Sequence, residues 1–556
     1  MQVIYRPPIA RTPVSESVEH SFSQRLGNWY PVALAAAIPV VYLPNLVDAY
    51  ILPRASLVIV GACLGTGLAL VVPTRRSLGG LRLPLIAALA AALLAFAFSV
   101  SWPLSAIGGY TRYESLPMRL AYLGLLAVPV WLLRTPQTRA LVAVAIVLGA
   151  TECAVLAITQ INAPFRPDGN LGNANVLGAM IAMAAPMCVS SMLRRGWFAV
   201  AAWICAPLLV WGLVVSSSRS GAIAAIAGCA ALLVFSLRGS LAAVAAAVAG
   251  AAVVAGVVAI LTVPALRDLN GDPGATRFHL YADAVHMVAA RPLTGWGEEA
   301  TGLVFGQFLS GDWSPGVTFD RTHSGPLELG ATQGLLGLVA GTWLLVVIGR
   351  RLWARRFDTS DARLFRAPIA SVPAGAVGAA LVAYTVWVVF NFDWAPVTGV
   401  FWLLAGTGWS MTAAEDDDPA LAAATVLQTA RRLGGAIALV AVAVAFGALP
   451  VLAEAWYSNG RPDLAVQADP LQAQYRRALG EALTQQGRSA EGLEQLRFAA
   501  SLGETDPALY VELGDAELAA GNVDAARADY RRALAIDPYW EPARRRLSGT
   551  GGLGTA

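Results

Sequence analysis

Residues 197–236 read WFAVAAWICAPLLVWGLVVSSSRSGAIAAIAGCAALLVFS, two apolar runs on either side of a short polar turn. Each run has about 18 residues or more, which is enough for an α-helix to cross a bilayer core of about 30 Å. The turn contains Arg219, which would lie at the membrane boundary. An ionisable residue in that position is a candidate for function. The competing interpretation is an arginine that extends to the lipid headgroups.

The same apolar pattern recurs along the first 455 residues. The chain is 56% hydrophobic and 13% charged, a composition that excludes an ordinary soluble protein. The candidate membrane spans are residues 30–48, 54–73, 84–104, 117–133, 139–160, 174–193, 197–216, 220–237, 241–264, 333–352, 367–390, 396–413 and 434–455. The sequence therefore predicts an all-α fold: a polytopic membrane helix bundle of about 12–13 transmembrane helices that occupies residues 1–455.

Arginine positions predict the orientation of this bundle. Residues 1–28 are polar and lack the apolar core of a signal peptide, so we expect them in the cytoplasm. The positive-inside rule places the densest arginine cluster, residues 350–366, on the same side. Residues 265–332 then face outward as one large polar segment, called the long loop below. The net charge of +3 is close to neutral and argues against a nucleic-acid partner.

The composition changes after residue 455, where the apolar runs end. Leu479-Gly480 recurs 34 residues later as Leu513-Gly514. This period resembles the tetratricopeptide repeat, a pair of helices that stacks into a surface for binding partners. We therefore expect a tetratricopeptide-repeat module over residues 456–556 that binds a protein partner, on the same side of the membrane as the long loop.

Several sequence signals of cofactors and metals are absent. All five cysteines fall inside predicted spans, so they indicate no disulfide framework. The chain contains no P-loop, no H-E-x-x-H motif and no dinucleotide-binding fingerprint. The first outer loop, residues 49–53, lacks the paired carboxylates of a metal-dependent transferase, and Glu298-Glu299 is interpreted as a helix N-terminus. We expect neither a cofactor nor a metal site.

The outward-facing polar residues indicate an anionic substrate. The long loop contains Arg277, Arg291 and Arg321, and the second outer loop contains Arg112. A guanidinium group binds phosphate oxygens in a bidentate manner and stays charged in apolar surroundings. Together with Arg219, these arginines predict a diphosphate site at the membrane surface.

His323 is the candidate general base. It comes just before Pro326, in what should be the first turn of the next membrane helix. Beside a helix N-terminus and several arginines, the protonated imidazole would be disfavoured, so the neutral base would be available near neutral pH. The alternative is a histidine that only caps the helix. His279 and His286 are expected to be structural residues on one face of a short loop helix.

The order of short motifs along the chain resembles the O-antigen ligase and polymerase superfamily of bacterial membrane enzymes. The motifs are Gly172-Asn-Ala-Asn175, Ser218-Arg-Ser-Gly221, Arg277-x-x-x-Tyr281, Arg291-Pro-Leu-Thr-Gly-Trp-Gly297, Asp320-Arg-Thr-His323 and Gly334-Leu-Leu-Gly337. The resemblance covers about residues 30–412. The chain departs from the family at Ser324, where asparagine is usual, and at Tyr281, where tryptophan is common.

The resemblance implies a metal-independent glycosyltransferase at the outer face of the cytoplasmic (inner) membrane, with a polyprenyl diphosphate-linked glycan as donor. By motif, Arg219 and Arg291 would bind the diphosphate with help from Arg277. His323 would activate the acceptor hydroxyl, which attacks the anomeric carbon as the lipid diphosphate leaves. The other residues predicted for this site are Arg321 and Arg112 for the diphosphate, and Asn173, Asn175 and Tyr281 as supporting residues.

The sequence leaves the acceptor open. A ligase would transfer the glycan to lipid A-core, a polymerase would extend a lipid-linked glycan, and a protein O-oligosaccharyltransferase would modify a protein. The repeats slightly favour an assembly or protein-acceptor role. Outside this class, a polysaccharide transporter would need charges buried in mid-span and inverted repeats. A repeat-bearing scaffold would leave the arginine and histidine loop unexplained.

Overall fold

The computed structural model of the chain describes residues 22–72, 76–193, 196–262, 274–356, 373–412 and 426–550. Every regular element in these ranges is a helix, which confirms the all-α prediction. Parts of several predicted features lie outside the described residues, among them the N-terminal segment before residue 22, positions 357–366 of the arginine cluster, positions 367–372 of the span at 367–390, positions 265–273 of the long loop and the end of the C-terminal module after residue 550.

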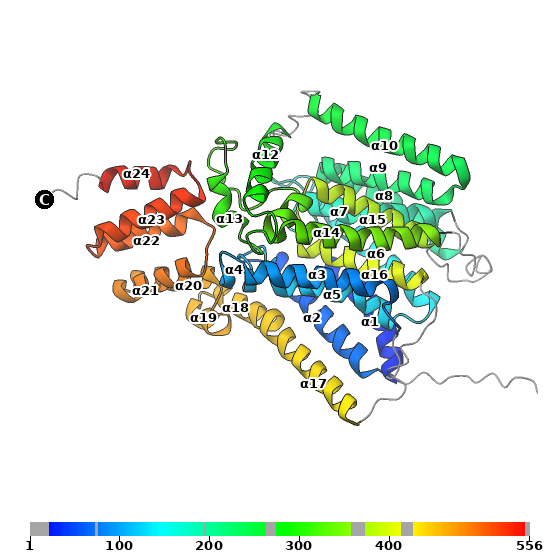
Figure 1. Ribbon diagram of the computed structural model, residues 1–556, viewed down its shortest axis with the longest axis horizontal. Helices are drawn as coiled ribbons and strands as arrows, with labels where there is room; N and C mark the ends of the chain where they lie inside the picture. The colour runs from blue at the N-terminus through cyan, green and yellow to red at the C-terminus, as the bar shows by residue number, and fades with distance from the viewer. Residues whose placement is uncertain are drawn as a thin grey trace, which may run out of the picture.

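The helices of the first 455 residues form a polytopic bundle, as predicted (Figure 1). Their bounds are α1 Phe22–Val40, α2 Ile51–Val71, α3 Arg82–Ala97, α5 Leu116–Leu132, α6 Pro136–Thr159, α7 Ala174–Met192, α8 Trp197–Ser216, α9 Arg219–Ser236, α10 Gly239–Thr262, α14 Gly325–Ala354, α15 Ala374–Val389, α16 Ala395–Thr412 and α17 Val426–Ala443. Among the described residues, eight helices are long and apolar enough to cross a membrane. Each predicted span overlaps a helix.

The first helix begins and ends earlier than predicted. Helix α1 stops at Val40, so the predicted span of 30–48 lies eight residues too far along the chain. Arg54, in the first turn of α2, is one reason why α1 ends at Val40. It is fully buried, and its guanidinium donates to the carbonyl oxygen of Pro39 at 2.8 Å. A carbonyl at the end of a helix has no partner within the helix, so a buried arginine stabilises the end.

Two other spans differ from the prediction in shape. The span expected at 84–104 consists of α3 and a short helix, α4 (Trp102–Ile107), because Pro103 occupies the first turn of a new helix. The last span is longer than expected. Helix α17 continues through a π-helical turn, η6 (Val444–Ala448), into α18 (Leu449–Ser458). This long helix leads from the bundle to the C-terminal module.

Small residues allow α7 and α9 to pack closely inside the bundle. A Cβ atom at Gly221 would lie 2.6 Å from the Cα of Gly178, so neither position accepts a side chain without displacing the helices. Ser218 caps α9 by accepting a hydrogen bond from the N–H of Gly221 at 3.2 Å. The Ser218-Arg-Ser-Gly221 motif therefore fixes the start of α9.

The outside of the bundle is apolar. On α8, for example, the side chains of Trp203, Ile204 and Val210 are each more than 60% exposed. Such a surface is unfavourable in water and suits contact with lipid chains. The chain is therefore a membrane protein with several spanning helices.

The C-terminal module consists of helical pairs. Its helices are α19 Pro462–Ala468, α20 Ala473–Gln485, α21 Ser489–Ser501, α22 Pro507–Ala519, α23 Val523–Ile536 and α24 Glu541–Thr550. Helix α20 packs on α21 and α22 packs on α23. The first residues of α20 and α22 are 34 positions apart, as are those of α21 and α23. The spacing agrees with the period in the sequence, and the tetratricopeptide assignment remains a prediction.

The C-terminal module lies against the long loop at one end of the bundle (Figure 1). The Thr318 hydroxyl donates to Asp537 at 3.0 Å, and the backbone of Gly306 packs against the carbonyl of Ile536. On the bundle side, the Ser101 hydroxyl donates to the carbonyl oxygen of Leu502 at 3.4 Å. The module is thus fixed to the loops that carry the predicted site.

Candidate functional site

The long loop folds into a small core of its own above the bundle. Three helical segments build it: α12 Gly274–Ala290, α13 Thr301–Val304 and the 3-10 turn η3 Phe305–Gln307. Their buried side chains, including Leu280, Met287 and Phe305, pack together with Ala331 of α14. This core gives the polar residues of the loop a fixed support.

His323 lies where the long loop enters α14. Its φ angle is 55°, a conformation that costs a non-glycine residue about 1 kcal/mol or more and persists only where neighbours fix it. The Tyr281 hydroxyl donates to the carbonyl oxygen of His323 at 3.1 Å. Glu328, in the first turn of α14, accepts from the N–H of Thr322 at 2.9 Å. Contacts on both sides therefore fix the backbone that carries the imidazole.

Phe392, in the connection between α15 and α16, is the point on which several predicted residues converge. The imidazole of His323 meets its ring edge-on at 5.6 Å. The guanidinium carbons of Arg112 and Arg321 lie 5.4 Å and 5.6 Å from the same ring. Arg277 donates to the carbonyl oxygen of Phe390, two residues earlier, at 2.9 Å. The structure thus brings together four of the residues that were predicted from motifs far apart in the sequence.

Arg321 is buried and engaged by carboxylates. It forms ion pairs with Glu299 and with Glu328, the latter at 3.5 Å, and only 2% of its side chain is exposed. Burial lowers the pKa of Arg321, and the charge of Glu328 opposes that effect. A guanidinium surrounded in this way positions its neighbours. Its predicted contact with a diphosphate would require the carboxylates to move.

Arg112 is more open than Arg321. It donates to Asp320 at 2.7 Å, and each side chain of the pair is a little over a quarter exposed. Its guanidinium also lies 5.2 Å from the ring of Trp394. An arginine with this exposure beside aromatic rings can exchange part of its contact for a phosphate oxygen.

Sequence reasoning missed a second buried ion-pair network, centred on Arg119. This residue, in the first turn of α5, pairs with Glu298 at 3.1 Å and with Asp393 at 2.7 Å. The Gln333 amide donates to Glu298 at 2.5 Å. Glu298 and Glu299 were predicted to start a helix. They do precede α13, and in addition each forms an ion pair with a buried arginine.

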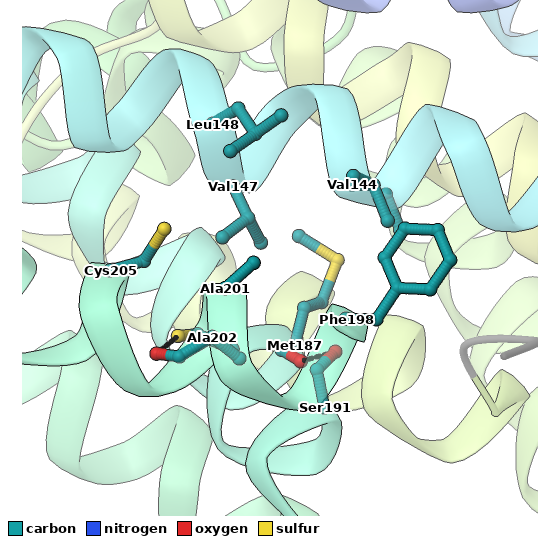
Figure 2. A pocket seen from close by; sticks show the side chains of 11 residues that line it. Val144, Val147, Leu148, Met187, Ser191, Phe198, Ala201, Ala202 and Cys205 are labelled. Atoms are coloured by element: carbon teal, nitrogen blue, oxygen red, sulfur yellow. Dashed lines mark hydrogen bonds between the residues drawn. The ribbon is translucent and has the colours of Figure 1, made fainter. Parts of the chain in front are cut away.

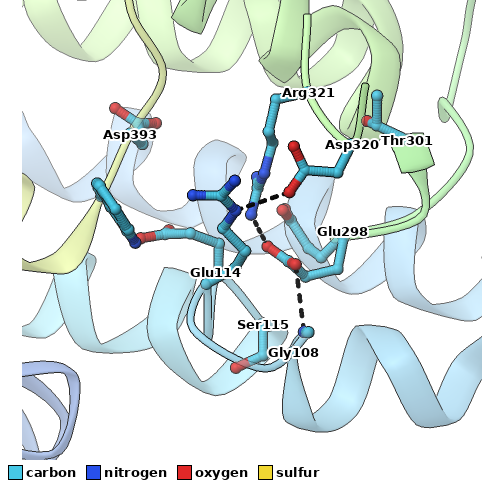
Figure 3. A network of polar contacts seen from close by, with 12 residues as sticks. Gly108, Glu114, Ser115, Glu298, Thr301, Asp320, Arg321 and Asp393 are labelled. Carbon is cyan, nitrogen blue, oxygen red and sulfur yellow. Dashed lines mark hydrogen bonds and ion pairs between the residues drawn. The ribbon is translucent and has the colours of Figure 1, made fainter. Parts of the chain in front are cut away.

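Glu114 is the most isolated carboxylate at the site (Figure 3). It is fully buried, and one oxygen accepts from the Tyr122 hydroxyl at 2.6 Å. The other oxygen has no hydrogen-bond partner within the described residues. Burial raises the pKa of Glu114 to about 7, although the charge of Arg119 opposes this shift. The carboxyl group is therefore poised to change charge near neutral pH.

Arg291 and Arg219 lie away from Phe392. Arg291 donates to the carbonyl oxygen of Phe98 at 3.3 Å and lies 4.5 Å from the ring of Trp296, so it borders α3. Arg219 is the first residue of α9, directly after the capping Ser218. Six residues were predicted to take part in catalysis or diphosphate binding. Of these, Arg291 lies beside the end of α3 and Arg219 lies at the start of α9, and neither has a described contact with Phe392.

The predicted supporting asparagines form a cluster next to Arg219. Asn173 caps α7 by accepting from the N–H of Asn175 at 2.8 Å. The side-chain oxygen of Asn175 accepts from the Ser218 hydroxyl at 3.2 Å and from Arg166 at 3.3 Å. Arg166 also donates to the carbonyl oxygen of Ser216 at 3.1 Å. These contacts hold the turn before Arg219, and Arg166 is a residue that the motifs did not single out.

Two cavities differ in their chemistry. One lies between α3, α5, α14 and α16, and is lined by Arg119, Gln333 and Asp393 together with apolar side chains such as Leu344. The other, between α6, α7 and α8, is lined by residues without charge, among them Met187 and Phe198 (Figure 2). Of these two, the first is the one suited to a ligand with both a polar and an apolar part. Within the described residues, no group of three or more His, Cys, Asp and Glu side chains is arranged to hold a metal.

One comparison with known proteins matches this region. Residues 204–342 match the family described as O-antigen ligase. The match confirms the resemblance over a segment that includes Arg219, Arg277, Arg291, Arg321 and His323. It supports a glycan-transferring enzyme embedded in the membrane. Comparison with curated proteins found no match.

Proposed function

We propose that the protein transfers a glycan from a polyprenyl diphosphate carrier to an acceptor hydroxyl, without a metal, at the outer face of the cytoplasmic membrane. The observation that carries the proposal is the convergence of His323, Arg112 and Arg277 on the Phe390–Phe392 segment, next to the O-antigen ligase match. A base and several cations at one membrane face suit an anionic lipid donor.

The donor would bind through arginines with different tasks. Arg112 and Arg277 would contact the diphosphate near Phe392, Arg219 would approach it from the start of α9, and Arg291 from the end of α12. The family motif assigns the last two the main role. Arg321, with its two carboxylate partners, is reassigned to holding His323 in place. The cavity beside Arg119 would accommodate the apolar start of the carrier chain.

His323 would accept the proton of the acceptor hydroxyl. The oxygen would then form a bond to the anomeric carbon while the bond between that carbon and the diphosphate oxygen breaks. The lipid diphosphate would leave with the electron pair, and the arginines would stabilise the charge that develops on it. Because these cations already neutralise the leaving group, EDTA should leave the rate unchanged.

The decisive experiment is transfer by purified protein from a polyprenyl diphosphate glycan, with His323→Ala as the variant. A positioned base contributes about 10²–10⁴-fold, so the rate should fall by that factor while donor binding persists. His286→Ala, an exposed histidine of α12, is the matched control and should keep full activity. A His323→Ala rate within a few-fold of the parent would leave the histidine only a structural role.

The acceptor separates the remaining alternatives. Lipid A-core, a second lipid-linked glycan and a protein should be offered in parallel. Product on lipid A-core identifies a ligase, growth of the lipid-linked glycan identifies a polymerase, and modified protein identifies an O-oligosaccharyltransferase. The C-terminal module lies beside the site, which favours an acceptor or partner that also contacts the module.

A further inference from the structure

Glu454 joins three segments that are far apart in the sequence. It lies in α18, is fully buried, and accepts from the N–H of Asp48 at 2.8 Å. Its carboxylate also accepts from the hydroxyl of Tyr110, in the second outer loop, at 2.9 Å, and from that of Tyr475, in α20, at 2.8 Å. Hydrogen bonds to a buried charge are among the stronger ones, so this carboxylate links the C-terminal module to the bundle loops.

The C-terminal module and the end of α18 contact the first half of the second outer loop, residues 108–115. The ring of Tyr110 packs edge-on against Tyr457 at 6.2 Å and Tyr475 at 6.1 Å. The Gln472 side chain donates to the carbonyl oxygen of Gly108 at 3.4 Å. The position of this half of the loop is therefore set by residues that belong to α18, α19 and α20 or to the turns between them.

The same loop carries Arg112 to the site, two residues after Tyr110. Thr111 and Tyr113, on either side of Arg112, have φ angles of 65° and 58°. Each such conformation is unfavourable for a residue other than glycine and persists only where surrounding contacts impose it. The loop therefore presents Arg112 to Asp320 and Phe392 only while both of its ends are held.

The ring of Tyr113 is buried in the core of the bundle and holds the second half of the loop. Its hydroxyl is buried without a hydrogen-bond partner among the described residues, and so is the hydroxyl of Ser56. Both residues line one cavity, together with Asp469 at the edge of the module. On the side of the site, the Gly109 N–H donates to Glu299 at 3.2 Å. The Trp394 indole donates to the carbonyl oxygen of Thr111 at 3.3 Å. The contact between Tyr110 and Glu454 holds the loop on the side of the module.

We infer that Glu454 and Tyr110 are positioning residues for Arg112, so that the C-terminal module takes part in building the donor site. The inference rests on the proposed function in one respect, since it uses Arg112 as a contact for the donor diphosphate. It goes further because it gives the module a role in donor binding, in addition to any role in acceptor choice.

The kinetic test uses Glu454→Gln and the milder Tyr110→Phe. Both should raise the KM for the lipid donor by about threefold to tenfold, the range that corresponds to losing an ordinary hydrogen bond, with kcat within about twofold. Glu491→Gln is the matched control, because Glu491 is an exposed glutamate of the C-terminal module that pairs only with Arg488 among the contacts described. In a double-mutant cycle, the effect of Tyr110→Phe on donor KM should disappear when Arg112 is already alanine.

A second measurement does not depend on activity. Thr111→Cys places a thiol in the loop, while the native cysteines are buried or partly buried in the helices. A membrane-impermeant maleimide should label Thr111→Cys faster when Glu454→Gln or Tyr110→Phe is also present. Unchanged labelling and unchanged donor KM in both variants would overturn the inference. Faster labelling with no change in donor KM, in these variants and in Arg112→Ala, would keep the positioning role and contradict the proposed contact between Arg112 and the donor.

Discussion

The long loop and the C-terminal module both contain arginine–carboxylate pairs, and one pair from each region shows how different their environments can be. In the loop, Arg321 and Glu299 are 2% and 5% exposed. In the module, Arg488 and Glu491 are 52% and 55% exposed. Removing one partner of a buried pair leaves an uncompensated charge in a poor solvent, whereas water replaces the lost partner at the surface. The loop geometry should therefore depend strongly on the Arg321 pair, and the module should depend little on the Arg488 pair.

The largest effect should come from Arg321→Ala. The substitution leaves Glu299 and Glu328 buried without their cation, which typically costs about 3–5 kcal/mol. We expect a clear fall in the midpoint of thermal unfolding of the detergent-solubilised protein. Faster proteolysis of the long loop should accompany it. An unchanged midpoint and unchanged proteolysis would show that the loop does not rely on this pair.

The next effect is a pH dependence that originates from Glu114. Burial raises its pKa from 4.5 to about 7, so the unfolded chain ionises first as the pH rises. Between these values the unfolded state binds fewer protons, and the stability of the fold decreases with increasing pH, by up to about 3 kcal/mol above pH 7. Glu114→Gln does not titrate and should be more stable than the parent at pH 8, with a smaller difference at pH 5. A difference independent of pH would contradict the buried, isolated carboxyl group.

The sequence was sufficient for much of the fold because bilayer thickness imposes a length and a composition on each helix. It also predicted His323, Arg112, Arg277 and Arg321, from local motifs or from their position in an outer loop, and the structure brings them close to residues 390–392. Their roles in catalysis and binding stay predictions. The position of Arg219 at the start of α9 follows from the same kind of local signal.

The buried carboxylate network could not be predicted in this way. Arg119 and Glu298 are 179 residues apart in the sequence, and no local pattern pairs them. The sequence offered one hint of this network: Glu328 is a single charged residue at the edge of an apolar run, which marks it as a candidate for a buried contact. The ends of α1 and α3 were misjudged for a similar reason, since Arg54 and Pro103 act through contacts or backbone geometry that a hydropathy profile does not register.

A smaller effect should follow from Gly306→Ala, at the contact between the loop and the module. A Cβ atom there would collide with the backbone carbonyl of Ile536. Overpacking of this kind costs about 1–3 kcal/mol, so the module should separate from the loop more readily. A cross-link between Thr318→Cys and Asp537→Cys, whose parent side chains lie 3.0 Å apart, would report the separation as slower disulfide formation. Gly549→Ala, a helical position with no atom within 4 Å of the added Cβ, is the control and should not slow it.

The smallest effect should come from Arg488→Ala, in the exposed pair of α21. The guanidinium and the carboxylate of Glu491 are three positions apart on one helix, and each is about half exposed. Solvent and salt screen such a pair, and either group is hydrated when the other is removed. The thermal midpoint and the donor KM should therefore both match the parent at low and at high salt. If Arg488→Ala destabilised the protein as strongly as Arg321→Ala, exposure would not be what separates the two regions. A partner or a second copy of the chain covering α21 in solution would then become the better explanation, and the oligomeric state of the purified protein would test it.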